Sequence, residues 1–598
     1  MAACYPAVTV RLVEIRLLEG PNVYRLEPVV KVELAIGRRR TFYGERRPAR
    51  HALVWLGDPV AARGWPDPVA AIAAWIRRLR SDQGEGAGGL TVHRSSDPGH
   101  WIVAYPWSGA ERARAIAEAA VALAERDVSP SRTARLTGHQ ERLVTRWVAR
   151  IAESGTSPPA WIRDADRRVP IVSISGTNGK STVTRLVTHV LVAAGHRVGT
   201  TTSDGVLVDE RIVDAGDWTG PGGAQMILAR SDIGMAVLET ARGGIVLRGV
   251  GYESNEVSVL TNVSADHLDL QGIHTLPELA EVKSVIARIT KPNGWVVLNG
   301  DDPLVAAVRR RVRGRVALFS IVPGGTRLVR RHVAAGGRAY VLRDGMDAYE
   351  LEGDRASKIV DVGRVPITIG GIALHNVANV LAAAGAARGL GMSIEHVRRG
   401  LVDFRPTAEQ SPGRLNLFRL GQRIVVVDFA HNEAGVAAVL DVAEGIAGGA
   451  AGRAAPITAI IGTAGDRPDD TLRGIGRIAA ERAQRVAIKE TVKYLRGRTR
   501  ASVVGEILAG ITAGGVPRGS VPVYESETGA LQAELNGTGP GAAAGGARPD
   551  SPRVIVLMCH EDRDGVFEML ASLGARPVDV AAELTELVPR LQRRTHRV

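Results

Sequence analysis

The spacing of apolar and polar positions divides the chain into regions of two kinds. In the first ~165 residues short apolar strands alternate with an amphipathic helix at 109–126, where Ala, Ile, Val and Leu recur at helical spacing. From residue 169 a β-branched run, a glycine loop, an apolar helix and a second strand follow one another, as in a βαβ unit. The pattern therefore changes from α+β to α/β at about residue 165.

Later apolar runs repeat the strand and helix alternation of the βαβ unit. Segments 316–372 are expected to form short strands and turns, and 373–389 an alanine-rich helix that ends in glycine. Strands are predicted at 233–239, 257–262, 295–299, 423–429, 457–461 and 554–558, with helical segments between most of them. This alternation predicts two mostly parallel sheets.

The length of 598 residues exceeds the size at which one hydrophobic core keeps growing, so several domains are expected. We predict an α/β multidomain fold with three units. They are an N-terminal α+β domain at 1–165, a central phosphate-loop domain with a parallel sheet at 166–408, and a C-terminal Rossmann-like α/β domain at 409–598. A glycine-rich stretch at about 536–549 is predicted to be a flexible insertion.

Composition indicates a globular protein, with 45% hydrophobic and 23% charged residues. The net charge of +13 comes almost wholly from arginine, because the chain holds only seven lysines. These charges are scattered and carry no nucleic-acid-binding motif, so no nucleic-acid partner is expected. A nucleic-acid-binding protein remains an alternative that rests on the high pI alone.

Cys4 and Cys559 suggest neither a disulfide framework nor a zinc site. The sequence shows no signal peptide or membrane span, so we expect a cytoplasmic protein with no membrane partner.

A glycine loop between the first strand and helix of the βαβ unit has the geometry that a phosphate group needs. Backbone N–H groups and the helix dipole face an anion there, a lysine can reach the outer phosphates, and a serine can ligate Mg²⁺. The loop consists of Gly176, Thr177, Asn178, Gly179, Lys180, Ser181 and Thr182. An ordinary strand-to-helix turn is the alternative, but the strand, loop and helix fall in the required order.

Polar side chains also stand at the ends of later predicted strands, where α/β sheets bind their ligands. Glu239 ends the run IGMAVLE and is a candidate oxygen ligand for Mg²⁺. His267 follows the next strand in the segment TNVSADHLD. Taken alone, His267 is more often an ordinary polar histidine than a ligand, and only its neighbours make it a candidate.

Together these residues resemble the Mur ligase family, and within it the ligase half of cyanophycin synthetases. The motifs that carry the resemblance are GTNGKST, LETARGGI, TNVSADHLDLQGI, ELAEVKSVI, LNGDDP, LHNVANVLAA, PGR and VVDFAHNEAG, in that order. They cover the chain from about residue 168 to its end. The resemblance implies an ADP-forming ligase that uses ATP and Mg²⁺ to phosphorylate a carboxylate and then joins it to an amine.

The resemblance also implies a role for each matching residue. Lys180 and Ser181 would hold the triphosphate and Mg²⁺, with Glu239 on the same metal, and His267 would bind a second Mg²⁺. Lys283 matches a lysine that is carbamylated in many members, which would let it ligate that metal; a surface lysine is the alternative. For the nucleotide, the matching residues are Asn376 and Asn379 at the adenine, Arg414 at the phosphates, Asp428 at the ribose and His431 near the γ-phosphate. The two asparagines could instead be capping or packing groups.

The N-terminal region resembles the N-terminal domain of cyanophycin synthetases, but it runs almost directly into the ligase half. Those synthetases carry an ATP-grasp domain between the two, so the resemblance implies a single ATP site here. The helix expected at 67–80 lacks the Glu–His pair common in that domain, so we expect no hydrolytic metal site. His51, His93 and His100 are expected to be surface polar groups.

The resemblance implies an amino acid and an acidic peptide or small carboxylate as substrates, since the ligase half of the relatives joins arginine to an aspartate side chain. A homo-oligomer is possible. A nucleotide-binding regulatory or scaffold subunit without ligase turnover is the alternative function.

Overall fold

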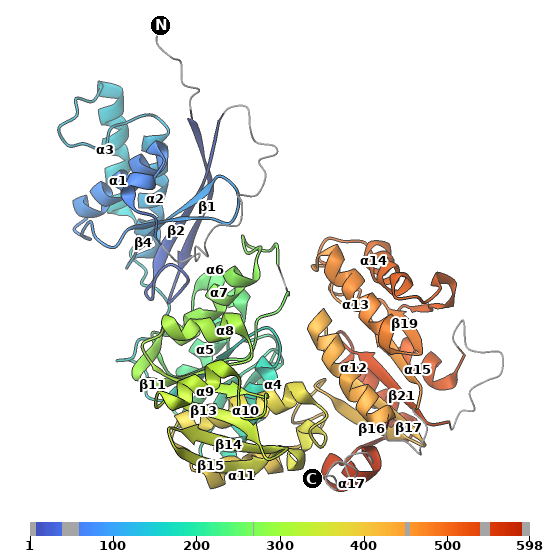
Figure 1. Ribbon diagram of the computed structural model, residues 1–598. Coiled ribbons are helices and arrows are strands. Elements are labelled where there is room, and N and C mark those ends of the chain that lie inside the picture. The colour runs from blue at the N-terminus through green and yellow to red at the C-terminus, as the bar shows by residue number, and fades with distance from the viewer. Residues whose placement is uncertain (1–7, 39–58, 267, 449–454, 539–550, 589–598) are drawn as a thin grey trace.

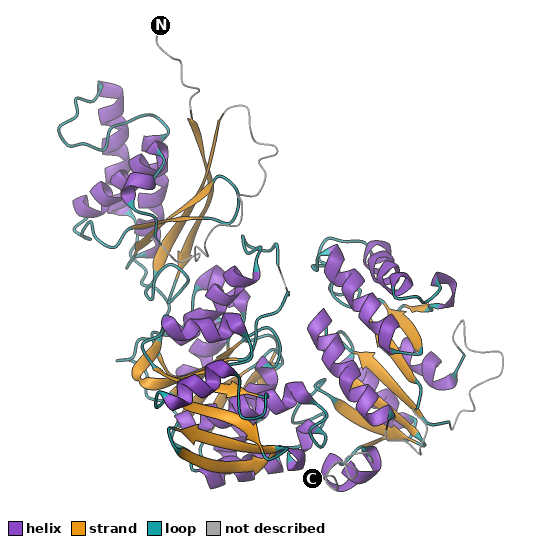
Figure 2. Cartoon of the chain, in the orientation of Figure 1, coloured by secondary structure: helices purple, strands orange, loops and turns teal. Residues whose placement is uncertain are grey.

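The computed structural model describes residues 8–38, 59–266, 268–448, 455–538 and 551–588, which form three sheets with their helices (Figure 1). Within these ranges the sheets have four, eleven and seven strands, in that order along the chain. Helices surround the second and third sheets and lie to one side of the first (Figure 2). The predicted α/β multidomain fold is confirmed.

The first sheet is antiparallel, with the strand order β1-β2-β4-β3. Its helices pack against one face, where Trp75, Ile116 and Val103 share a core. The elements are β1 (Val8–Leu18), β2 (Val29–Arg38), η1 (Ala62–Gly64), α1 (Asp67–Asp82), β3 (Thr91–Arg94), β4 (His100–Pro106), α2 (Ala110–Ala124) and α3 (Gly138–Glu153). The helix expected at 109–126 is α2. The pattern did not predict α3, because Val144 and Ile151 are the residues it buries and its apolar stripe is narrow.

The second sheet is parallel in its centre, with the order β15-β14-β13-β12-β11-β10-β5-β9-β6-β7-β8. Its strands are β5 (Ile171–Ser175), β6 (Val198–Thr201), β7 (Gly205–Val208), β8 (Arg211–Ala215), β9 (Met235–Glu239), β10 (Asn255–Leu260), β11 (Thr290–Asn299), β12 (Arg315–Ser320), β13 (Arg338–Arg343), β14 (Asp347–Glu352) and β15 (Arg355–Asp361). The strand β5 lies between β10 and β9, and the antiparallel pairs are confined to the two outer parts of the sheet.

Helices cover both faces of this second sheet because neighbouring residues of a strand point to opposite sides. Ile174 packs into a core with α4 and α10, and Ile171 packs into a second core with α7. The helices are α4 (Lys180–Ala193), α5 (Pro221–Leu228), α6 (Arg242–Arg248), α7 (Leu276–Arg288), α8 (Pro303–Ala307), α9 (Arg327–Ala334), α10 (Leu374–Gly389) and α11 (Ile394–Asp403), with short 3₁₀ turns at Val308–Arg310, Val362–Arg364 and Pro366–Thr368. Both faces are therefore buried, as a parallel sheet requires.

The third sheet has the order β20-β19-β18-β21-β17-β16-β22, and its five strands from β20 to β17 are parallel. Its elements are β16 (Asn416–Leu420), β17 (Arg423–Asp428), α12 (Glu433–Ala447), β18 (Ile457–Ile461), α13 (Asp469–Arg482), β19 (Arg485–Lys489), α14 (Arg500–Ala513), η5 (Arg518–Ser520), β20 (Val523–Tyr524), α15 (Glu527–Asn536), β21 (Arg553–Met558), α16 (Arg563–Ser572), β22 (Arg576–Pro577) and α17 (Val580–Leu587). The predicted insertion at 536–549 falls largely outside the described residues, and Asn536 itself ends α15.

The expectation of surface histidines in the N-terminal region is wrong for His93. Its side chain is fully buried, with Nε2 2.8 Å from Thr91 Oγ1 and the ring 5.1 Å from that of Tyr24. His100 is half-buried, and its Nδ1 lies 2.9 Å from Glu33. His51 lies outside the described residues. In the part of the chain that the structure describes, no helix is long and apolar enough to span a membrane.

Candidate active site

The predicted phosphate loop joins the end of β5 to the start of α4. Gly176 (φ 152°) and Gly179 (φ 85°) have backbone angles that favour glycine. A Cβ atom at Gly176 would lie 1.9 Å from Thr261 Oγ1, and one at Gly179 would lie 2.3 Å from Asn379 Oδ1. Both glycines are thus required by close contacts, and the free N–H groups at the start of α4 face the loop.

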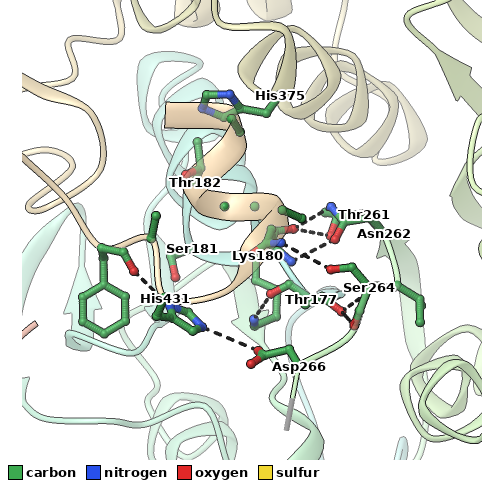
Figure 3. Close-up of a pocket in the computed structure, with 18 of the residues that line it drawn as sticks. Thr177, Lys180, Ser181, Thr182, Thr261, Asn262, Ser264, Asp266, His375 and His431 are labelled. Carbon is green, nitrogen blue, oxygen red and sulfur yellow. Dashed lines mark hydrogen bonds and ion pairs between the residues drawn. The ribbon is translucent and has the colours of Figure 1, made fainter. Parts of the chain in front are cut away.

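The loop is held in place by the residues that follow β10. The N–H of Asn178 donates to Asn262 Oδ1 at 2.9 Å, and the hydroxyl of Thr261 donates to the Asn178 carbonyl at 2.6 Å. The N–H of Thr177 donates to the Asn262 carbonyl at 2.8 Å. Figure 3 shows Thr261 and Asn262 beside the loop on the side opposite His431. These contacts fix the loop backbone.

Lys180 is half-buried and bends back over the loop, where its Nζ donates to the Thr177 carbonyl at 2.9 Å. Ser181 is buried one residue further on, with its Oγ 3.4 Å from that of Ser203. The ammonium group of Lys180 and the hydroxyl of Ser181 therefore both lie at the mouth of the loop.

Glu239 ends β9 next to the loop and is 3% exposed. Burial raises the pKa of its carboxyl group, and the nearby charge of Lys180 opposes that shift. Within the described part of the chain, its buried Oε2 has no hydrogen-bond partner. A buried carboxylate oxygen without a donor, beside a serine hydroxyl, has the chemistry of a hard-cation ligand.

Lys283 lies on α7, and its side chain extends to the phosphate loop. Its Nζ donates to the Gly176 carbonyl at 2.7 Å, and the residue is 5% exposed. The alternative of a surface lysine is therefore wrong. Burial, reinforced by the charge of Lys180, holds the pKa of Lys283 well below its usual range.

His267 lies outside the described residues, but its neighbour Asp266 is placed. Asp266 Oδ2 lies 3.5 Å from His431 Nε2, and Oδ1 lies 3.3 Å from Arg467 Nε. In Figure 3 the ring of His431 points toward Asp266, directly before the undescribed residue. Asp266, in the loop that follows β10 of the second sheet, thus contacts His431 and Arg467 from the unit of the third sheet.

Asn376 and Asn379 lie on one face of α10 and are buried against the loop. The amide of Asn379 donates to Asn376 Oδ1 at 2.9 Å, and the amide of Asn376 donates to the Ile367 carbonyl at 2.9 Å. His375 stands beside them, and burial lowers its pKa to about 4. Within the described ranges, these contacts do not use every donor and acceptor of the two amides.

Two further predicted residues, Arg414 and Asp428, approach the loop from the third sheet. The guanidinium of Arg414 lies 4.6 Å from the ring of Phe429, and its Nη2 lies 3.5 Å from Ser181 Oγ. Asp428 accepts the N–H groups of Leu415 and Ala430, each at 2.8 Å, and burial raises the pKa of its carboxyl group.

The second and third sheets enclose a cavity of about 1150 Å³ at this point. The predicted residues that line it are Thr177, Asn178, Gly179, Lys180, Ser181, Thr182, Glu239, Lys283, Asn376, Asn379, Arg414, Asp428 and His431. The two sides are also joined directly, because the amide of Asn432 donates to Asn178 Oδ1 at 3.0 Å. Parts of the chain more than two hundred residues apart thus form one site.

Several residues of the site were not predicted from the sequence. Thr261 and Asn262 hold the loop, Asp266 and Arg467 bridge the two sheets, and Asn432 contacts the loop itself. The motifs TNVSADH and FAHNEAG contain four of these five residues, so their position next to predicted ligands was a usable signal. Arg467 carried no such signal.

Fold and cavity together define a multidomain phosphate-loop protein with its site between two α/β units. The Mur ligase middle domain matches residues 174–387. A UDP-N-acetylmuramoyl-L-alanyl-D-glutamate–2,6-diaminopimelate ligase of Alkalilimnicola ehrlichii is 30% identical over 386 residues, which are 63% of this chain and 70% of that protein. The chain belongs to the Mur ligase family.

Higher identity is found with a cyanophycin synthetase of Crocosphaera subtropica, at 42% over 348 residues. That match covers 58% of this chain but only 39% of the synthetase, so the chain spans less than half the length of this relative. Among solved structures, a bifunctional folylpolyglutamate synthase/dihydrofolate synthase from Yersinia pestis has 18% identity and a TM-score of 0.46, covering 68% of this chain and 89% of that one.

Proposed function

We propose that this chain is an ATP-dependent carboxylate–amine ligase that forms an amide through an acyl phosphate and releases ADP and phosphate. The observation that carries the proposal is the composition of the cavity. Lys180, Ser181 and the unpaired oxygen of Glu239 lie on one side, and Arg414 and His431 face them from the other. The proposal includes the three units at 1–165, 166–408 and 409–598, with the reaction between the second and third.

The nucleotide would lie along the start of α4. Lys180 and Arg414 are the cations placed to balance the charge of the phosphates, while the loop N–H groups bind their oxygens. Asn376 and Asn379 would contact the adenine, and Asp428, whose oxygens keep spare lone pairs, would accept from a ribose hydroxyl. The stacking of Arg414 on Phe429 supports this reading, because it holds the guanidinium near Ser181.

The donor set at the loop fits Mg²⁺. Ser181 and Glu239 would hold one ion, and His267 with a carbamylated Lys283 would hold a second. A bound Mg²⁺ supplies charge neutralisation and geometry for the transferred phosphoryl group. The lowered pKa of Lys283 favours the neutral amine, which is the form that adds CO₂ to become a carbamate.

The chemistry proceeds in two steps. A carboxylate oxygen of the first substrate attacks the γ-phosphorus and ADP leaves, with Lys180 and Arg414 stabilising the charge on the phosphoryl oxygens. The amine of the second substrate then attacks the acyl carbon and phosphate leaves. His431, held beside Asp266, is placed to accept the proton that the amine loses.

The substrates proposed are an amino acid as the amine and an acidic peptide or amino-acid carboxylate as the acceptor. The most informative test is a phosphate-release screen of amino acids against acidic peptides in the presence of ATP and Mg²⁺, with mass spectrometry of the products. Release that needs both substrates, with a product one water lighter than their sum, supports the ligase. Tight ATP binding without release for any pair would support a regulatory or scaffold subunit instead.

A further inference from the structure

A buried ion pair lies beside the cavity in the third sheet and has no role in the proposed reaction. Lys489 ends β19, and Glu527 begins α15. Their side chains are 0% and 1% exposed, and Nζ lies 2.6 Å from Oε1. Burying two charges is expensive, and a pair of apolar side chains is often at least as stable, so stability alone is a weak reason for this pair.

The carboxylate of Glu527 is surrounded by the turn that follows β21. It accepts the N–H groups of His560 at 2.5 Å, Glu561 at 3.1 Å and Asp562 at 2.8 Å, and the Cys559 thiol lies 3.0 Å away. Burial disfavours the charged carboxylate, but the ammonium of Lys489 and these donors lower the pKa of Glu527 to about 2. The turn is therefore built around a charged group.

The same ammonium fixes the state of His560. Lys489 Nζ lies 2.9 Å from His560 Nδ1, and an ammonium group can only donate, so Nδ1 must accept. The ring proton then sits on Nε2, which donates to the Ala430 carbonyl at 3.0 Å. Burial, reinforced by the charge of Lys489, holds the pKa of His560 well below its usual range. His560 is thus a neutral donor with a single tautomer.

The group that receives this hydrogen bond lies in the strand end that carries the proposed site residues. Ala430 stands between Phe429 and His431. The ring of His560 lies edge-on to Phe429 at 5.1 Å, and Arg414 stacks on the same ring at 4.6 Å. His560 therefore contacts the segment that places both Arg414 and His431.

We propose that Lys489, Glu527 and His560 form a positioning unit that holds Phe429, Ala430 and His431 against the phosphate loop. The unit acts through His560, whose Nε2–H fixes the Ala430 carbonyl. Lys489 and Glu527 do not line the cavity and set only the tautomer and orientation of that ring. The inference rests on the proposed function for its effect on turnover, but the tautomer of His560 can be measured without it.

The test is the double variant Lys489→Met/Glu527→Gln, which removes both charges together and keeps one acceptor oxygen for the N–H groups of His560 and Glu561. The variant should stay folded, because no unpaired charge is left buried, although the N–H of Asp562 loses its acceptor. With the Nδ1 donor gone, His560 can take either tautomer. We expect kcat to fall roughly 10- to 100-fold with the KM for ATP within about threefold, since the reacting groups are displaced rather than removed.

A matched control exists in the same sheet. Arg485 and Glu534 form another ion pair, with side chains 18% and 1% exposed, and neither lines the cavity. The variant Arg485→Met/Glu534→Gln should keep the kcat of the unchanged protein. A similar loss in both double variants would reduce the first pair to general structure and overturn the inference.

The tautomer is read from the imidazole nitrogen signals of ¹⁵N-histidine-labelled protein, with His560 identified by loss of its signal in His560→Phe. An Nε2–H signal in the unchanged protein that becomes mixed in the double variant supports the inference. An Nδ1–H tautomer, or a folded double variant with unchanged kcat, overturns it. An unchanged protein that turns over no substrate pair contradicts the proposed function, and the nitrogen signals then decide the positioning unit alone.

Discussion

At the residue scale, the lysines show how the site is built. The chain has seven, and Lys180, Lys283 and Lys489 lie in or beside the cavity. Lys493 stands between the lining residues Thr491 and Tyr494, whereas Lys291 lies away from the cavity in ion pairs with Asp164 and Glu256. Lysine is a compact charge whose pKa shifts readily on burial, and Lys283 shows that shift beside the loop.

Replacing Lys180 by alanine should remove ATP turnover and leave the fold intact. The side chain lies at the start of α4 and would supply charge to the phosphates, so a loss of roughly 10³-fold or more in kcat is expected. Lys291→Ala, at a partly exposed ion pair, is the matched control and should retain activity. Equal turnover in the two variants would contradict the phosphate-loop assignment.

Replacing Lys283 by alanine should also inactivate the protein, for a different reason. The side chain is buried beside the loop, and as a carbamate it would supply metal oxygens. Added short carboxylates should restore part of the activity of Lys283→Ala but none of that of Lys180→Ala. Intact mass under CO₂ should show the carbamate directly, and a fully active Lys283→Ala protein would remove the residue from the site.

At the scale of elements, the two ends of α4 provide a test of the loop. Gly179 precedes the helix and Gly195 follows it, with φ values of 85° and 89°. A Cβ at Gly195 meets nothing within 4 Å, whereas one at Gly179 would clash with Asn379. Alanine at either position should cost about 1–2 kcal/mol of stability from the left-handed backbone.

Only Gly179→Ala should also lose affinity for ATP, because the clash must move either the loop or helix α10, which carries Asn379. Isothermal titration with ATP and melting curves of both variants separate the two effects. ATP affinity that falls equally in Gly179→Ala and Gly195→Ala would show that the loss comes from general destabilisation of α4.

The parts of the fold and site that could be predicted are those encoded in one continuous stretch of sequence. The loop 176–182 is one unbroken segment between a strand and a helix, so the sequence specifies it locally. The bridges from Asp266 to His431 and Arg467 depend on how two sheets meet, which periodicity does not encode. The unit of Lys489, Glu527 and His560 was missed for the same reason, and the role of His267 stays a prediction.

At the scale of the whole molecule, the segment after β1 packs the N-terminal unit against the central one. The N–H of Glu19 donates to the Arg248 carbonyl at 2.7 Å, and a Cβ at Gly20 would lie 1.8 Å from the Val250 carbonyl oxygen. His274 lies between Asp97 of the first unit and Asp269 of the second, at 2.8 and 2.7 Å. The N-terminal unit is therefore in contact with the loop that carries Asp266, where it could position a substrate.

The described residues contain one phosphate loop in one cavity, which supports one acyl phosphate at a time. We therefore expect the chain to form one kind of amide bond and not to extend a peptide backbone. Incubation with ATP, Mg²⁺, aspartate, arginine and a short acidic primer should give a single type of addition by mass. Growth by repeated aspartate–arginine units would reveal a second active site.

The central claim is that the γ-phosphate of ATP is transferred to a carboxylate in this cavity. It is tested most directly by giving the protein an acceptor whose carboxyl group is labelled with ¹⁸O and analysing the products by mass spectrometry. The account predicts ADP, an amide, and one ¹⁸O atom in the released phosphate, all absent with Lys180→Ala. Transfer of ¹⁸O to AMP, or amide formation without label in phosphate, would contradict it.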